Sequence, residues 1–311
     1  MPEISEFLSE SEEFCSIKFT VLYSGWRVDH ALSEISDDLT RSSLKQRLRL
    51  LTVNGKPVKL SAKLRKGDLV EAVWMKHLEP SFEPEEVDFG IIYRDHDLMI
   101  IDKPWNLTVH PAKGHESGTL ANGVLHFFRS RNLDEGFGAE NRPGIVHRLD
   151  KDTRGLMIIA LNAESSYKLC RAFKERRIKK IYKAIVKGTA PDFGIVDKPI
   201  GRSLYDRKKM AIVPRGRPSV TEFKTLERLN GASLVACNLL TGRTHQIRVH
   251  MASLGYPVLG DLLYGKTTIP LPGIALLASY LKFEHPKTGM EMEFKLPDPP
   301  EFLDLLQSLR E

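Results

Sequence analysis

A string of charged residues interrupts an apolar, sheet-forming stretch near the middle of the chain. Residues 147–155 read His-Arg-Leu-Asp-Lys-Asp-Thr-Arg-Gly, and they lie between the apolar runs 144–146 and 156–160. Charge in or beside a half-buried sheet is costly unless it is paired or hydrogen-bonded. One interpretation is a polar hairpin with solvated charges, and the other is a carboxylate placed at a site. The second interpretation makes this string the leading candidate for a functional site.

Length and composition restrict the class of protein. The chain has 311 residues, of which 41% are hydrophobic and 28% charged, as in an ordinary soluble protein of two domains. No apolar run approaches the roughly 20 residues that cross a bilayer, and the acidic N-terminus does not have the pattern of a secretory signal. The three cysteines are widely spaced, which argues against a disulfide scaffold or a zinc site and fits a reducing compartment. We expect a cytoplasmic protein with no membrane partner.

Charge divides the chain into four parts. The net charge is +6, yet residues 1–15 and 79–88 are acidic, so the remainder is more basic than the total indicates. A basic body favours a polyanionic partner. We expect a flexible acidic tail over 1–15, a small basic domain over 16–75, a linker over 76–88 and a large domain over 89–311.

The small domain combines a predicted helix with a predicted hairpin. Leu44, Leu48 and Leu51 recur at helical spacing and would face a core. Asn-Gly among the β-formers of residues 52–58 predicts a tight hairpin. The helix would also carry a basic stripe, formed by Arg41, Lys45 and Arg49. Such a stripe can bind a phosphate backbone, although a solvated helix face has the same pattern.

The large domain mixes short strands and helices without a regular β-α-β order. Strands are expected at 90–93, 98–102, 145–149, 156–161, 181–186, 221–226 and 233–240, and helices at 119–130, 164–175, 244–254 and 300–309. Because local hairpins dominate, we predict an α+β fold, with a largely antiparallel mixed sheet flanked by helices.

Five strings in the large domain resemble, in order, the RluA family of RNA pseudouridine synthases. The string 147–155 is similar to the catalytic motif of that family. The other matching strings are Asp97–Pro104 with Gly118–Leu120, Lys179–Ala184 with Gly188, Thr241–His250 with Gly260-Asp261, and Ile274–Ala278. The resemblance implies an RNA-modifying isomerase.

The small domain resembles the S4 RNA-binding domain. The matching pattern is Arg27-x-Asp29-x-x-Leu32, then Arg41-Ser42, Val53-Asn54-Gly55 and Gly67-Asp68. With this domain in front, the resemblance points to the RluD-like members, and hence to uridines of 23S ribosomal RNA as substrate. We expect a monomer. That family usually has Gly between the helix and the next strand, whereas residues 47–51 have none, so we expect a shortened turn.

The implied reaction breaks the N1–C1′ bond of uridine and rejoins the uracil through C5. It needs no redox step or outside group, so no cofactor or metal is expected. A carboxylate can act as nucleophile, and the resemblance assigns this role to Asp150. The family leaves open whether the carboxylate attacks C6 or C1′, or takes a proton from C2′. Arg248 is the implied salt-bridge partner that keeps Asp150 ionised in an apolar pocket.

The resemblance also implies how the target base reaches Asp150. Enzymes that act on stacked bases flip them out, and Arg148 would fill the gap in the RNA. Tyr182, which stands among lysines, would support the flipped uracil, and Leu276 would line the pocket. Core packing is the alternative for Tyr182, and a surface position is the alternative for Arg248.

Several residues leave other interpretations open. Arg154, Leu277 and Asn106 depart from the family pattern, which favours Ser, His and Gly at these positions. His245 and His250 are five residues apart, which does not match a helical metal site, and none is predicted. The basic segment 171–180 would either follow an RNA backbone or form a solvated face. A catalytically silent ribosome-assembly factor and a carboxylate-dependent hydrolase remain the rival functions.

Overall fold

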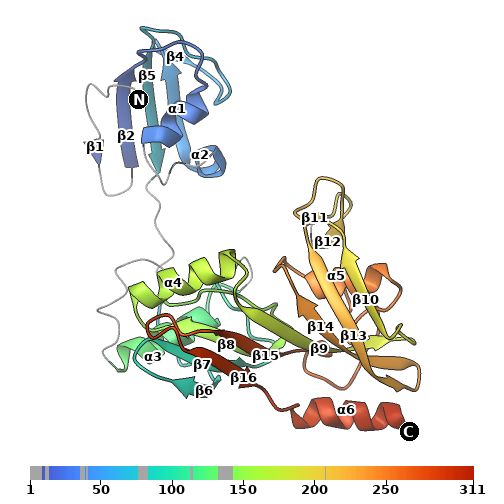
Figure 1. Cartoon of the computed structure of the whole chain (residues 1–311). Coiled ribbons are helices and arrows are strands. Elements are labelled where there is room, and N and C mark those ends of the chain that lie inside the picture. Colours follow the sequence, from blue (N-terminus) through green and yellow to red (C-terminus); the bar gives the residue numbers. More distant parts are fainter. Residues whose placement is uncertain are drawn as a thin grey trace. The chain divides into compact units, whose positions relative to one another are not determined.

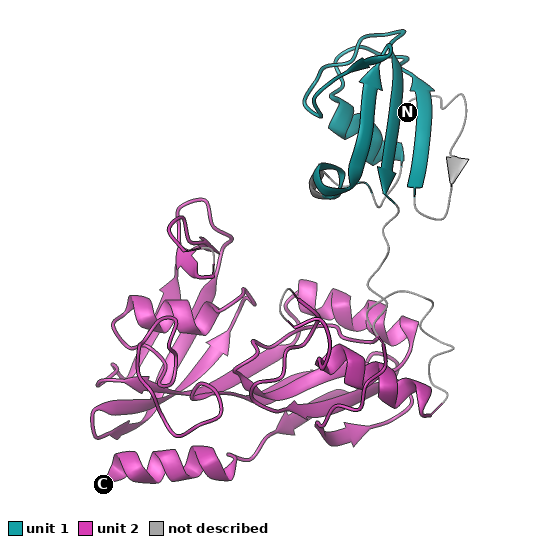
Figure 2. Cartoon of the chain, turned by 180° about the vertical axis from the view of Figure 1, so that it is seen from behind, with its two compact units in different colours: residues 1–81 teal, residues 82–311 magenta. Residues whose placement is uncertain are grey.

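The chain forms two compact units, residues 1–81 and 82–311, in a computed structural model (Figures 1 and 2). The structure describes residues 9–10, 14–35, 39, 41–75, 83–112, 115–131, 143–206 and 208–311. In these ranges no helix has both the length and the apolar character that a membrane crossing requires. The predicted tail 1–15 and linker 76–88 lie partly outside the described residues, and β2 begins at Phe14.

The first unit is a small antiparallel sheet with two short helices (Figure 1). The strand order is β1-β2-β5-β3-β4. The elements are β1 (Ser9–Glu10), β2 (Phe14–Thr20), α1 (Val28–Ile35), α2 (Arg41–Arg47), β3 (Leu48–Val53), β4 (Lys56–Pro57) and β5 (Leu69–Met75). Its core is separate from that of the second unit and is built on large buried side chains, among them Phe19, Leu32, Leu44 and Trp74.

Two local predictions for this unit are confirmed, and one is wrong. Asn54 and Gly55 both have positive φ, 51° and 73°, as a tight hairpin between β3 and β4 requires. The turn after the helix is shortened, since β3 follows α2 directly. The helix therefore ends at Arg47, and the prediction that Arg49 continues its basic stripe is wrong. Pairing with β5 draws residues 48–53 into the sheet, so Arg49 lies on β3.

The second unit is built on a nine-stranded sheet (Figure 1). Eight of its strands follow the order β10-β13-β14-β9-β15-β8-β7-β6, and the ninth, β16, pairs with β15. Every pairing is antiparallel except that of β15 with β8. The strands are β6 (Gly90–Arg94), β7 (Leu98–Lys103), β8 (Arg154–Ala160), β9 (Lys179–Lys187), β10 (Phe193–Asp197), β13 (Val220–Leu229), β14 (Ala232–Leu239), β15 (Leu276–Glu284) and β16 (Glu291–Lys295). The predicted α+β class and largely antiparallel mixed sheet are confirmed.

Among the described residues, four helices flank this sheet, and a separate hairpin, β11 (Ile200–Arg202) with β12 (Met210–Ile212), projects from it (Figure 1). The helices are α3 (Leu120–Arg129), α4 (Ala163–Lys174), α5 (Gln246–Ser253) and α6 (Pro300–Arg310). Helix α4 packs against β8, α5 against β12 and β13, and α6 against β13. Local sequence fixes the helix starts: Asn162 caps α4 by accepting the backbone N–H of Ser165, and α6 begins at a proline.

The segment in front of the charged string is not the strand that its apolar residues predict. Only Ile145 pairs, in an isolated bridge with Ile159. The next residues leave the sheet, and Nε2 of His147 accepts the backbone N–H of Ile158 at 2.8 Å. A side chain thus takes the place of a backbone ladder, and the loop that carries Asp150 is fixed to β8 at its start.

Candidate active site

All five residues assigned to the catalytic site by sequence meet at one cavity. Its volume is about 490 Å³, and the residues among its lining are Arg148, Asp150, Tyr182, Arg248 and Leu276. They come from three separate parts of the fold: the loop before β8, the paired strands β9 and β15, and helix α5. The sheet and α5 therefore bring together side chains that are far apart in the chain.

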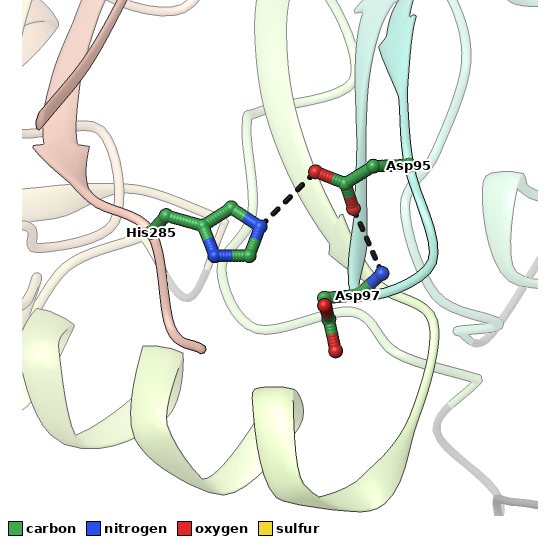
Figure 3. Close-up of side chains that lie close together, drawn as sticks. All are labelled: Asp95, Asp97 and His285. Atoms are coloured by element: carbon green, nitrogen blue, oxygen red, sulfur yellow. Dashed lines mark hydrogen bonds and ion pairs between the residues drawn. The ribbon is translucent and has the colours of Figure 1, made fainter. Parts of the chain in front are cut away.

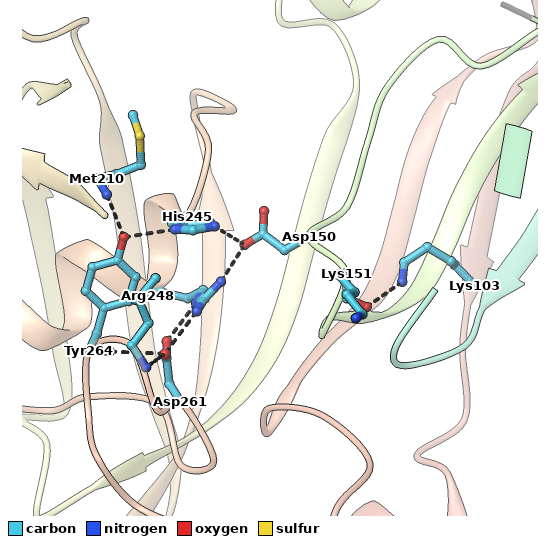
Figure 4. Close-up of polar contacts among 9 residues, drawn as sticks. Lys103, Asp150, Lys151, Met210, His245, Arg248, Asp261 and Tyr264 are labelled. Atoms are coloured by element: carbon cyan, nitrogen blue, oxygen red, sulfur yellow. Dashed lines mark hydrogen bonds and ion pairs between the residues drawn. The ribbon is translucent and has the colours of Figure 1, made fainter. Parts of the chain in front are cut away.

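Arg248 joins Asp150 to a second carboxylate (Figure 4). Its Nη1 lies 3.3 Å from Oδ2 of Asp150, while its Nε and Nη2 lie 2.7 and 2.9 Å from the two carboxylate oxygens of Asp261. The Arg248 side chain is 6% exposed and that of Asp261 is 0% exposed. Burial alone would lower the pKa of Arg248, but Asp261 and Asp150 outweigh burial and raise it. The guanidinium thus stays charged and has a fixed orientation toward Asp150.

Asp261 is itself held in place by the backbone that follows it. Its Oδ1 accepts the N–H groups of Leu263 and Tyr264 at 3.0 and 3.1 Å. Its two oxygens therefore receive four hydrogen bonds, two from backbone and two from Arg248. Charge-assisted bonds of this kind are the strong ones, and bidentate geometry fixes the plane of the guanidinium.

His245 approaches Asp150 from the start of α5. Its Nε2 lies 4.0 Å from Oδ2 of Asp150, and its Nδ1 lies 2.8 Å from the hydroxyl of Tyr264 (Figure 4). That hydroxyl also accepts the N–H of Met210 at 2.8 Å, and burial raises the pKa of Tyr264 to about 12. Burial lowers the pKa of His245. If the Tyr264 hydroxyl donates its proton to Nδ1, the proton of the neutral imidazole lies on Nε2, which faces Asp150.

Lys103 supports the Asp150 loop from behind. It is fully buried at the end of β7, and its ammonium donates to three carbonyl oxygens, those of Pro104, Leu107 and Lys151, at 2.8, 2.9 and 3.0 Å. Figure 4 shows the last of these bonds, made to the residue directly after Asp150. Burial lowers the pKa of Lys103 to about 7, against the attraction of nearby carboxylates, Asp150 foremost. The three bonds use every donor of an ammonium and set the path of the loop.

His147 fixes the other side of the same loop. Its ring stacks on Phe173 of α4 with a centroid separation of 4.5 Å, and its Nε2 accepts from Ile158. Burial, with a smaller effect of Lys180, lowers the pKa of His147 to about 3. The imidazole is therefore neutral at physiological pH, as its role as acceptor of a backbone N–H requires.

Tyr182 and Leu276 form an apolar wall of the cavity. Tyr182 is on β9 and Leu276 is on β15, and both are buried apart from the surface that lines the cavity. Burial and, second, the charge of Asp150 raise the pKa of Tyr182, so its hydroxyl remains protonated. Arg148, by contrast, is an exposed residue at this cavity.

The three departures from the family pattern have structural explanations. The Arg154 guanidinium bonds to Asp102, with Nη2 to Oδ2 at 2.9 Å, and lies over the Trp105 ring, 5.0 Å from its centroid. Leu277 is fully buried in the sheet. Asn106 has a φ of 60°, a left-handed conformation that Asn tolerates better than most residues. None of the three lines the cavity.

One group of side chains in the described ranges has the proximity of a metal site: Asp95, Asp97 and His285 (Figure 3). Its potential ligand atoms already have protein partners. Oδ2 of Asp95 lies 3.0 Å from Nε2 of His285 and accepts a hydrogen bond from the Tyr93 hydroxyl at 2.8 Å. Its Oδ1 accepts two backbone N–H groups. Asp97 accepts from Asn162 at 3.0 Å. These bonds tie the β6–β7 turn to the end of β15, which explains the cluster without a metal.

Four residues of the network were not assigned by sequence reasoning: Lys103, His245, Asp261 and Tyr264. Lys103 and Asp261 both stand in strings that match the family. Because a buried arginine needs a carboxylate partner, Asp261 could have been predicted from the sequence. The sequence pattern points to His245 only as a possible metal ligand, because its pairing with Tyr264 is formed by the fold. His250 also points away from this chemistry, because its ring atoms contact Thr221 and the carbonyl oxygen of Lys198.

Comparison with known proteins agrees with this geometry. The family model for RNA pseudouridylate synthase matches residues 97–253. An uncharacterized RNA pseudouridine synthase, YlyB of Bacillus subtilis (strain 168), is 39% identical over 91% of this chain and 94% of that protein. Ribosomal large subunit pseudouridine synthase D of Pasteurella multocida (strain Pm70) is 38% identical over 92% of both chains.

A solved structure shares the fold of the second unit. Human RNA Pseudouridylate Synthase Domain Containing 1 superposes with a TM-score of 0.55 at 30% identity, over 73% of this chain and 97% of that one. The matched model, the relatives and the fold agree with the motifs of the RluA type. The chain therefore belongs to the RNA pseudouridylate synthase family, as an intramolecular isomerase that converts uridine in RNA to pseudouridine.

Proposed function

We propose that this enzyme isomerises specific uridines of large-subunit (23S) ribosomal RNA, with Asp150 as its nucleophile. The observation that carries the role of Asp150 is its position on the wall of the cavity, 3.3 Å from a buried arginine and beside Tyr182. A cavity of about 490 Å³ is in the range that holds small ligands. The relative from Pasteurella multocida, whose name refers to the ribosomal large subunit, supports this choice of substrate.

Each lining residue then has a defined task. Arg248 orients and stabilises the Asp150 carboxylate, Tyr182 supports the face of the flipped uracil, and Leu276 excludes water from it. Arg148, which is exposed at the cavity, enters the gap that the flipped base leaves in the RNA. The reaction breaks N1–C1′ and forms C5–C1′, with the proton of C5 lost and one gained at N1, so its atoms balance without a co-reactant.

The first unit is proposed to bind RNA in the manner of an S4 domain. Its hairpin at Asn54-Gly55 and its shortened α2–β3 turn agree with the sequence pattern. Arg41 and Lys45 lie on α2 and Arg49 lies on β3, so the contact surface would combine a helix with a strand. We further propose that the enzyme acts in the cytoplasm as a monomer.

Pseudouridine mapping tests the substrate. Ribosomal and transfer RNA would be sequenced for pseudouridine in cells with and without the gene, and the purified protein would be added to unmodified ribosomal RNA. We expect loss of specific sites in 23S-type RNA and their restoration by the protein. Sites lost only from transfer RNA would reject the proposed substrate. If the protein binds RNA but converts no uridine, the assembly-factor alternative is favoured.

A further inference from the structure

The basic segment 171–180, which begins in the second half of α4, contains two kinds of positively charged side chain. Arg171 and Arg177 both pair with Glu175, at 2.6 and 2.9 Å, and they form a charged face on the protein surface. Lys174, Arg176 and Lys180 instead line the catalytic cavity. Within the described parts of the chain, none of these three forms an ion pair. The segment is thus neither wholly a solvated face nor wholly directed at the site.

Two arginines from elsewhere in the fold add positive charge near these lysines and Arg176. Arg243 lines the cavity from the loop before α5. Arg217 is not among the lining residues, but it directly precedes Pro218, whose carbonyl oxygen lies 3.3 Å from Nε of Arg243. The same loop lies next to Lys180, because a Cβ atom added at Gly242, the residue before Arg243, would be 3.7 Å from Nζ of Lys180. Burial lowers the pKa of Arg243, and the positive charges of Arg217 and Arg176 lower it further.

We call five residues the cation cluster: Lys174, Arg176, Lys180 and Arg243, which line the cavity, and Arg217, which lies next to Arg243 outside the lining. Mutual repulsion destabilises a group of like charges in the empty protein. No acidic side chain of the described residues offsets it by pairing with any member. An anion bound among the five side chains would offset it, and a phosphate suits the planar donors of arginine best.

The backbone conformation of Arg176 is a second, independent argument that its side chain binds a ligand. Helix α4 ends with Glu175, and the N–H groups of Arg176 and Arg177 bond back to Phe173 and Ala172 at 3.2 and 2.9 Å. This is a Schellman ending, in which the residue at the position of Arg176 is left-handed and most often glycine. Arg176 has a φ of 61° there. The fold would favour glycine, so the guanidinium is retained against a local cost.

We infer that the cation cluster is a receptor for backbone phosphates of the RNA strand next to the flipped uridine. This inference rests on the proposed function, since it takes the strand entering the cavity as its ligand. The cluster would hold the sugar-phosphate chain on one side of the cavity while Asp150 meets the base. It supplies position and affinity without reading sequence, because phosphates are the same at every nucleotide.

The substitution Arg176→Gly tests this inference with little risk to folding. We expect a melting temperature at or above that of the wild type, because glycine relieves the left-handed strain. Affinity for an RNA fragment that carries the mapped uridine should fall roughly three- to tenfold. The slope of log K against log salt should become shallower by about 0.7 to 0.9 for each phosphate that the variant no longer neutralises. Arg217→Ala should act in the same direction.

The control is Arg177→Ala, the adjacent arginine, which pairs with Glu175 and should leave affinity and salt slope unchanged. A neutral methylphosphonate beside the target uridine should weaken binding by the wild type and should add little to the defect of Arg176→Gly. If the fragment is converted by the wild type but bound equally by both proteins, with equal slopes, the phosphate receptor is rejected. If the wild type converts no ribosomal uridine, the proposed function fails instead.

Discussion

Two sets of basic side chains, one in each unit of the molecule, are held in opposite ways. In the catalytic unit, Arg248 is buried and contacts the carboxylates of Asp150 and Asp261. In the small unit, Lys45 and Arg49 are exposed, and neither forms an ion pair with any residue that the structure describes. A buried charge with fixed partners can orient a reacting group, whereas an exposed charge contributes to attraction that salt screens. Substitutions in the Arg248 network should therefore affect turnover and folding, whereas substitutions at Lys45 or Arg49 should affect affinity.

The largest effect is expected at the nucleophile. Asp150→Asn keeps the shape of the side chain and an oxygen that accepts from Arg248, so the fold and RNA binding should persist. Because an amide is a far weaker nucleophile than a carboxylate, pseudouridine formation should fall at least about a thousandfold. Single-turnover conversion of a ribosomal RNA fragment measures this. Asp152→Asn, two residues along the same loop and not in the cavity lining, is the matched control. Full activity of Asp150→Asn would refute the assignment.

The next effect tests the carboxylate that holds Arg248. Both carboxylate oxygens of Asp261 accept hydrogen bonds, either from the guanidinium or from two backbone N–H groups. In Asp261→Asn one oxygen becomes an NH₂ group, which would face one of these donors and leave it without an acceptor. Breaking a buried pair in this way costs about 3–5 kcal/mol of unfolding free energy. Urea denaturation would measure it. The surface pair of Asp192 with Arg228 is the matched comparison, and Asp192→Asn should cost less than about 1 kcal/mol. Equal costs at the two sites would remove the distinction between buried and exposed pairs.

A smaller effect should appear only as the pH is lowered. The pKa of His147 is about 3 in the folded protein and about 6.5 when unfolded, so the unfolded chain takes up the proton first. Its contribution to stability is complete above pH 6.5 and is lost as the pH falls toward 3. Between pH 7 and 5.5 the loss should be about 1 kcal/mol. His147→Gln keeps an acceptor but cannot titrate. Between pH 7 and 5.5 its unfolding free energy should therefore fall less than that of the wild type, by the amount just given. Parallel pH profiles of the two proteins would contradict a buried neutral imidazole.

The success of sequence-based prediction differs between local motifs and long-range partners. The family motifs include five residues that all line one cavity: Arg148, Asp150, Tyr182, Arg248 and Leu276. The Asn54-Gly55 hairpin followed from local backbone preference alone. The strand predicted over 145–149 was wrong, because a side-chain bond from His147 replaces the ladder there. The β11–β12 hairpin was not predicted, since each strand has only three residues and β11 contains glycine and arginine.

Arg49 shows why the small unit was harder to predict than the catalytic motifs. A helix continuing from Lys45 to Arg49 and a strand beginning at Leu48 satisfy the same apolar pattern, and pairing with β5 decides between them. That pairing joins residues 17 to 26 positions apart, which periodicity within a short window does not detect. The partners of Arg248 and His245 are long-range in the same sense. The motifs predicted residues that line one cavity, and tertiary contacts determine how those residues are held.

The smallest effect is expected on the exposed surface of the first unit. Lys45→Ala should leave the melting temperature unchanged and weaken RNA binding about two- to fourfold, with a salt slope shallower by about 0.7 to 0.9. Lys18→Ala is a matched control, because Lys18 is also exposed in this unit but pairs with Glu71 on the neighbouring strand. Filter binding across a range of salt concentrations would resolve the two. If both substitutions change the slope equally, the unit attracts RNA through its overall charge. If only Lys45→Ala does, α2 contacts the backbone directly, and the contrast with the buried Arg248 becomes one between positioning RNA and acting on it.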